Sequence, residues 1–159
     1  MKNIFAAILT TALLIPFALK AGQGVDAFDA YTYATSPVQK NGAVFLKLFN
    51  HTDHDVKMIA ADTYDVANTV ELHTHEHEDG IMRMRQVDYF MIEEDETVQL
   101  EPMGHHIMLF GLSKPLVEGD EFEMTVSFDT QDPVIVDVQV IAPGTHLNDS
   151  APHHDHSHH

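Results

Sequence analysis

Two stretches near the C-terminal end of the 159-residue chain decide the fold: residues 121–129 read EFEMTVSFD and residues 133–141 read PVIVDVQVI. In both, apolar and polar residues alternate, which is the period of a half-buried β-strand. The side chains expected to face the interior are Phe122, Met124, Val126 and Phe128 in the first stretch and Val134, Val136, Val138 and Val140 in the second. Each stretch therefore predicts a strand with one face in the core.

Shorter stretches of the same kind come earlier in the chain. Strands are predicted over residues 28–35, 43–50, 56–63, 69–74, 81–87, 97–100 and 105–111. In residues 43–50, Val44, Leu46 and Leu48 share one face of the expected strand. Turn signals separate these stretches, and helical periods are almost absent. Many short strands without intervening helices predict an all-β fold, an antiparallel sandwich or barrel.

The two ends of the chain differ in composition from the predicted strands. Residues 1–21 are typical of a secretory signal, with Lys2 before an apolar run over residues 4–19 and a usable cleavage site at residues 19–21. The run is shorter than the roughly 20 residues of a membrane span, although an uncleaved anchor is the alternative. We therefore expect a signal peptide (1–21), one domain (22–144) and a disordered His-rich tail (145–159).

Charge and cysteine content narrow the functions open to this chain. Its formal charge is −17, and removal of residues 1–21 takes away Lys2 and Lys20 but no acid, giving −17 − 2 = −19. Such a chain is not expected to bind nucleic acid or an anionic membrane surface through its net field. The sequence has no cysteine, which excludes a blue-copper centre, thiol exchange and lipid attachment through a cysteine. The mature protein is expected to be exported and soluble.

Four residues form a soft metal-ligand set: His73, Met84, His106 and Met108, with the spacing H-x10-M-x21-H-x-M. Two imidazoles and two thioethers are neutral donors, and thioether sulfur suits Cu(I) rather than zinc, calcium or magnesium. His106 and Met108 are two residues apart, so they share one face of a strand. We predict a Cu(I) site with these four ligands.

The turn between residues 69–74 and 81–87 decides which histidine lies nearest to Met84. A turn centred on Asp79-Gly80, a typical hairpin signal, places His75 opposite Met84. A turn centred between Glu78 and Asp79 places His73 there instead, because a change of register exchanges the cross-strand partners. From the pattern alone, both registers stay open.

Nearby residues have less specific interpretations. His75 and His77 are candidates for a second shell or an access route to the metal. Met82 is expected in the core, because methionine fills irregular gaps in apolar interiors. His105 shares a strand face with Ile107 and Leu109, so it is not expected to be a ligand.

The four-residue spacing and its flanking sequence resemble the periplasmic copper chaperones of the PCuAC family. The matching segments are residues 70–73 (VELH), 104–109 (GHHIML) and 112–120 (LSKPLVEGD), and the likeness covers roughly residues 25–142 but not the tail. The resemblance implies a cupredoxin-like sandwich and favours His73 over His75 as ligand. It also implies a periplasmic, non-enzymatic chaperone. Such a protein delivers Cu(I) to the dinuclear copper centre of cytochrome c oxidase, directly or through another exported copper-transfer protein.

The tail suggests a second metal site of different chemistry. Its histidines are His146, His153, His154, His156, His158 and His159. Nitrogen and oxygen donors without sulfur suit Cu(II), zinc or nickel. A periplasmic copper or zinc buffer is therefore an alternative function. A copper redox enzyme is less favoured, because the sequence supplies no acid–base pair and two thioethers favour the monovalent ion.

Overall fold

The computed structural model describes residues 24–145 and Leu147; the expected signal peptide and the six tail histidines lie outside these residues. The described residues form ten strands. Their bounds are β1 Val25–Tyr33, β2 Asn41–Asn50, β3 Val56–Asp62, β4 Ala67–Glu78, β5 Ile81–Gln86, β6 Phe90–Ile92, β7 Thr97–Leu100, β8 His106–Leu112, β9 Glu121–Phe128 and β10 Val134–Ile141. In this part of the chain, no helix is long and apolar enough to span a membrane.

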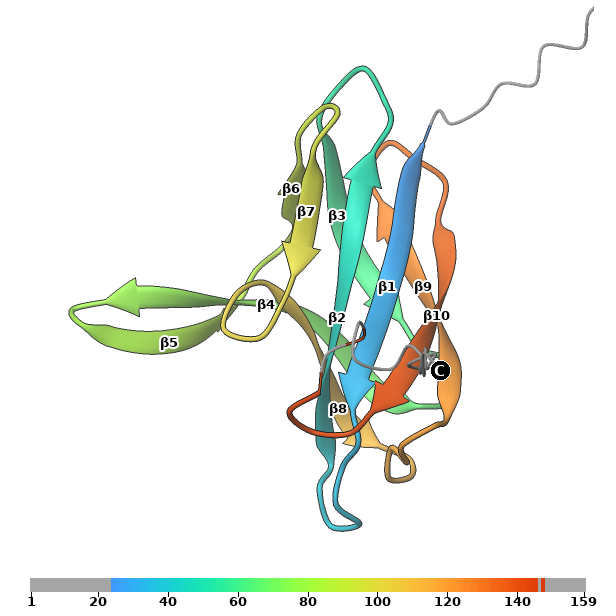
Figure 1. Cartoon of the computed structure of the whole chain (residues 1–159). Helices are drawn as coiled ribbons and strands as arrows, with labels where there is room; N and C mark the ends of the chain where they lie inside the picture. The colour runs from blue at the N-terminus through green and yellow to red at the C-terminus, as the bar shows by residue number, and fades with distance from the viewer. Residues whose placement is uncertain (1–23, 146, 148–159) are drawn as a thin grey trace, which may run out of the picture.

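The strands form one curled sheet in the order β5-β4-β8-β2-β1-β10-β9-β3-β6, with β7 paired to β2. β3 and β4 also lie against each other, so the sheet encloses an interior (Figure 1). The predicted all-β fold is confirmed. One pairing differs from the antiparallel expectation: β1 and β10 run parallel, with Tyr31 opposite Gln139. No hairpin joins these two strands, so no tight turn forces them to be antiparallel.

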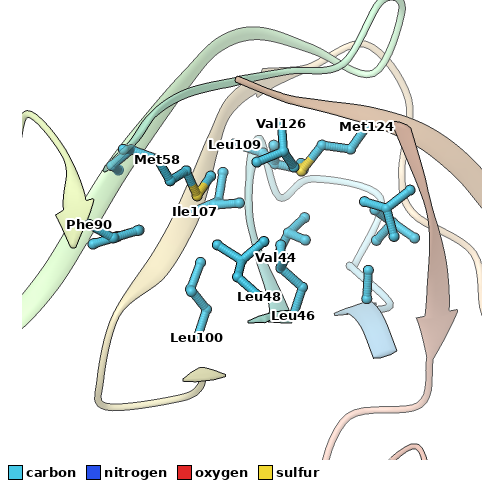
Figure 2. Packing of buried hydrophobic residues seen from close by; sticks show 14 of the residues in the cluster. Val44, Leu46, Leu48, Met58, Phe90, Leu100, Ile107, Leu109, Met124 and Val126 are labelled. Carbon is cyan, nitrogen blue, oxygen red and sulfur yellow. The ribbon is translucent and has the colours of Figure 1, made fainter. Parts of the chain in front are cut away.

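The core lies between the faces of the curled sheet that carry the predicted apolar residues. Val44, Leu46 and Leu48 of β2 are at most 1% exposed and point toward Met124 and Val126 of β9 (Figure 2). Ile107 and Leu109 of β8 enter the same cluster. The alternation predicted for β2, β9 and β10 is therefore confirmed. It fixes which face of β8 looks inward and which looks outward.

Two parts of the strand prediction need correction. The strand predicted over residues 69–74 runs from Ala67 to Glu78, because its second half continues into a hairpin with β5. β6, a strand of three residues that pairs with β3, was not predicted from the sequence. Its three residues are buried, exposed and buried in turn, and so short an alternation cannot be distinguished from a loop.

The β4–β5 hairpin projects from the body of the protein (Figure 1). We call residues 74–86 the hairpin arm. Beyond His73, β4 pairs with β5 but no longer with β8. Its turn is Asp79–Gly80, and both residues have positive φ, 52° and 77°. Two consecutive positive φ values are the requirement of a type I′ turn, whose twist matches that of a two-stranded hairpin.

Candidate metal centre

The four predicted ligands lie on three neighbouring strands, β5, β4 and β8. His73 is directly opposite His106 across the β4–β8 pair, and Glu71 is opposite Met108. Their sequence neighbours Leu72 and Ile107 are buried in the core on the opposite face of the sheet. The candidate ligands therefore share the outer face of the sheet, and the apolar residues between them anchor the strands.

His106 is held with one ring nitrogen free for a metal. It is 3% exposed, and its Nδ1 donates a hydrogen bond of 3.0 Å to the carbonyl oxygen of Gly104. A carbonyl only accepts, so Nδ1 carries the proton and Nε2 keeps its lone pair. That Nε2 lies 3.2 Å from the sulfur of Met84. An imidazole lone pair and a thioether sulfur therefore meet at one point.

His73 is arranged in the opposite tautomer. Its Nε2 lies 2.8 Å from the Glu71 carboxylate, which accepts the hydrogen bond. In the neutral ring, the Nδ1 of His73 is then the unprotonated nitrogen. This Nδ1 is buried and has no hydrogen-bond partner among the described residues. A buried acceptor without a partner is costly, so a ligand for this atom would offset an existing penalty.

The hairpin register places His75, not His73, opposite Met84. The turn centred on Asp79–Gly80 is therefore the correct alternative, and the register with His73 opposite Met84 is wrong. The ring of His75 lies 5.0 Å from that of His106, whereas the ring of His73 lies 5.9 Å from it. Within the part of the chain that the structure describes, the Nδ1 of His75 is also buried without a hydrogen-bond partner. His73 instead faces the site from its pairing with His106.

The sulfur donors lie at the accessible side of the cluster. Met84 is 47% exposed, and Met108 is half-buried at the edge of a surface hollow that Tyr33 and Gln39 also line. Met82, expected in the core, is 38% exposed. That expectation is wrong because the hairpin arm extends beyond the body, and no second layer of the described residues covers it.

Burial favours the neutral form of the candidate ligand His106. Desolvation lowers the pKa of His106 below 6.5, while the hydrogen bond to Gly104 acts in the opposite direction and the nearby His75 and His73 lower it slightly more. Burial also lowers the pKa of His105. His105 packs on Phe90 with a centroid distance of 4.6 Å, consistent with the prediction that it points away from the ligand cluster. A neutral imidazole is the form that binds metal.

The candidate centre relies on its two sulfur donors. Within residues 24–145 and Leu147, no group of three or more His, Asp or Glu residues could hold a metal ion. Two supporting groups, the Glu71 carboxylate and the Gly104 carbonyl, were not predicted from the sequence. A signal existed for Glu71, since it precedes His73 by two residues and so shares its strand face. The carbonyl has no sequence signature.

Solved structures of the same fold are PCuAC domains. The copper-bound PCuAC domain from PmoF2 has a TM-score of 0.64 and 21% identity, covering 77% of this chain and 95% of that domain. The solution structure of CuI-DR1885 from Deinococcus radiodurans has a TM-score of 0.63 and 26% identity, covering 79% of this chain and 83% of that one. The predicted cupredoxin-like fold and the resemblance to PCuAC domains are thus confirmed.

The family itself is identified from sequence. The family model described as "Putative lipoprotein LpqE-like" matches residues 25–140, and the chain belongs to this LpqE-like family. It is 32% identical over 101 residues to the uncharacterized protein RP573 of Rickettsia prowazekii, covering 63% of this chain and 55% of that protein. It is 30% identical over 92 residues to protein Lxx21020 of Leifsonia xyli subsp. xyli, covering 56% of this chain and 55% of that protein. The chain spans about half the length of these curated relatives.

Proposed function

We propose that this chain is a copper chaperone that binds Cu(I) through His73, Met84, His106 and Met108 and passes it to another copper protein. The observation that carries the proposal is the 3.2 Å approach of the Met84 sulfur to Nε2 of His106. A soft sulfur donor and a nitrogen lone pair are the donor types that Cu(I) prefers. The PmoF2 domain of the same fold is copper-bound, and the Deinococcus structure is of a Cu(I) form.

The ring nitrogens that would hold copper follow from the hydrogen bonds. His106 would bind through Nε2, because Gly104 occupies Nδ1. His73 would bind through Nδ1, because Glu71 occupies Nε2. A hydrogen bond to the ring nitrogen that does not bind metal fixes the tautomer and orientation of a metal-binding imidazole. Two neutral nitrogens and two thioether sulfurs leave the charge of the ion uncompensated, which favours the monovalent state over the divalent one.

The location of the sulfurs suits release of the ion. Met84 is exposed and Met108 borders a hollow, so a partner's ligands could reach the ion from outside. Copper is then cargo that moves by ligand exchange, with no change of oxidation state. No acid–base chemistry is required, and the function is non-enzymatic.

The compartment and the recipient belong to the same proposal. The signal-like residues 1–21 support export, and we place the mature protein in the periplasm. The recipient would be the copper-bearing subunit of cytochrome c oxidase or another exported copper-transfer protein. The tail histidines would bind Cu(II) or another divalent metal. This tail also supports the alternative of a periplasmic copper or zinc buffer, which would retain copper when an apo recipient is added.

Substitution of the sulfur donors tests the proposal. Met84→Leu and Met108→Leu keep side-chain volume and remove the soft donor. Each should weaken Cu(I) binding in competition with a chromogenic Cu(I) chelator, while stability changes by less than about 1.5 kcal/mol. X-ray absorption of the copper-loaded proteins should show weaker sulfur scattering around copper in both variants than in wild type.

Met91→Leu on β6 is the matched control, since Met91 is 40% exposed and lies outside the ligand cluster. Wild-type Cu(I) affinity in both ligand variants would refute the assignment. The loaded protein can be mixed with an apo oxidase copper domain or with another exported copper protein. If it keeps its copper in both mixtures, the buffer function is favoured over the chaperone function.

A further inference from the structure

The hairpin arm carries more soft donors than the candidate centre uses. His75 is directly opposite Met84, and His77 is directly opposite Met82. We call these the inner and outer His–Met pairs. Residues two apart on a strand share a face, so both pairs lie on the face that continues to His73 and His106. This face of the arm therefore presents two imidazoles and two thioethers in successive cross-strand pairs.

The opposite face of the arm holds its charged groups. Arg85 lies 3.2 Å from Glu76 and 2.6 Å from Glu78, and Arg83 lies 3.7 Å from Glu78. These ion pairs couple the two strands where no other layer supports them. They also keep both guanidinium groups on the face away from the soft donors. The His–Met face thus has neither a competing cation nor a carboxylate of its own between the pairs.

The spacing of the pairs suits stepwise movement of one ion. Directly opposite residues have Cβ atoms about 4.5–5.5 Å apart, so one ion can reach the nitrogen and the sulfur of the same pair. Successive pairs on one face are about 7 Å apart along the strands. That distance is within the combined reach of histidine and methionine side chains from neighbouring pairs.

The inner pair joins the candidate centre. The His75 ring lies 5.0 Å from the His106 ring, and the Met84 sulfur lies 3.2 Å from His106 Nε2. The Nδ1 of His75 is buried, and no residue described by the structure hydrogen-bonds to it. The outer pair is nearer to the turn, and Met82 is 38% exposed. The imidazoles therefore run from exposed His77 through half-buried His75 to buried His106, while the sulfurs of both pairs are exposed.

We propose that the outer pair, His77 and Met82, is a second and weaker Cu(I) site that loads the centre through His75 and Met84. The proposal rests on the Cu(I) function proposed above. In each step a bond from copper to His75 or Met84 forms as a bond to His77 or Met82 breaks. Copper stays monovalent, and no electron or proton is required from elsewhere.

The full-length variant His77→Gln/Met82→Leu tests this proposal against Glu76→Gln/Arg83→Gln. The control alters the adjacent cross-strand pair, on the charged face of the same arm. With Cu(I) supplied as a bicinchoninate complex, the His77/Met82 variant should bind one weak equivalent fewer than wild type. Stopped-flow loading of the centre should slow by about tenfold, because a neighbouring donor pair acts at high effective concentration. Its strong-site affinity should be unchanged, and the control should match wild type.

Wild-type stoichiometry and loading rate in the His77/Met82 variant would overturn the inference while leaving the proposed centre intact. Equal slowing in the control would also overturn it, because the effect would then come from the arm's stability. Absence of any strong Cu(I) site in the wild-type protein would instead refute the proposed function. Met108→Leu separates the two sites, since it should weaken the strong site and keep the weak one.

Discussion

The sulfur of Met84 lies 3.2 Å from Nε2 of His106, although β4 separates the strands that carry these two residues. The contact depends on the hairpin arm, because β5 reaches the rest of the sheet only through its pairing with β4. The Asp79–Gly80 turn sets that pairing. A local property of the turn thus controls a long-range contact in the candidate centre.

Replacement of the turn glycine should impair the centre from a distance. Gly80 has φ of 77°, and a Cβ added there would meet nothing within 4 Å. The cost of Gly80→Val is therefore backbone strain, about 1–2 kcal/mol, rather than a clash. The arm should fray or shift register, and Cu(I) affinity should fall while the core unfolds at nearly the same urea concentration.

Gly24→Val is the control, since Gly24 is also unhindered and its φ is not positive. Equal Cu(I) affinity in Gly80→Val and wild type would contradict this role of the turn.

Glu71 should support the centre without binding the metal. Its carboxylate accepts a 2.8 Å hydrogen bond from His73 Nε2 and so leaves Nδ1 free. Glu71→Gln keeps the shape but removes the charge that fixes this tautomer. We expect Cu(I) affinity to fall by about tenfold or more, as for other outer-shell partners. Nitrogen NMR of the apo protein should show a larger share of the other His73 tautomer.

The control for this prediction is Glu76→Gln, which removes a carboxylate from the other face of the same strand. Its Cu(I) affinity should match that of wild type. If Glu71→Gln also behaves as wild type in both measurements, the hydrogen bond to His73 does not prepare the ligand.

The apo protein should lose stability in mild acid partly through His106. Burial lowers the pKa of His106 in the folded state below 6.5. The unfolded state then binds more protons, so the free energy of unfolding falls as pH decreases from about 6.5 to the folded-state pKa, and this contribution is constant above that range. His106→Gln removes the titration, so its unfolding free energy should fall less steeply between about pH 7 and pH 5 in urea titrations. If the unfolding free energies of wild type and His106→Gln depend on pH in the same way, protonation of His106 does not destabilise the folded state.

Sequence patterning was sufficient for the parts of this fold that repeat. The alternation in β9 and β10 predicted that Met124, Val126 and Val138 are buried, because a strand has only two faces and one meets the core. The parallel β1–β10 pair was not predictable, since the strands come from opposite ends of the described chain and no local turn joins them. Residues 90–92 form a strand too short to show a period.

The arrangement of the candidate site was only partly predictable from sequence. The spacing predicted that His106 and Met108 share a strand face, but it did not predict that His73 pairs with His106 on the neighbouring strand. It left the hairpin register open, because a shift of one residue exchanges His73 and His75 opposite Met84. The core assignment of Met82 was wrong for a tertiary reason: strand periodicity does not reveal that an arm lacks a covering layer.

The tail should bind divalent metal independently of the centre. Leu147 lines a surface hollow with Tyr31 and Leu100, so the truncation is best placed after Asn148, where this contact is kept. This truncation removes five tail histidines: His153, His154, His156, His158 and His159. Calorimetry should show the loss of a class of Cu(II) or zinc sites, because these imidazoles are the nitrogen donors that such ions prefer. Cu(I) affinity should be unchanged, since His73, Met84, His106 and Met108 all precede the cut.

Identical divalent binding by the full-length and truncated proteins would show that the tail is only a solvated extension. Loss of Cu(I) binding on truncation would instead place the tail in the primary site.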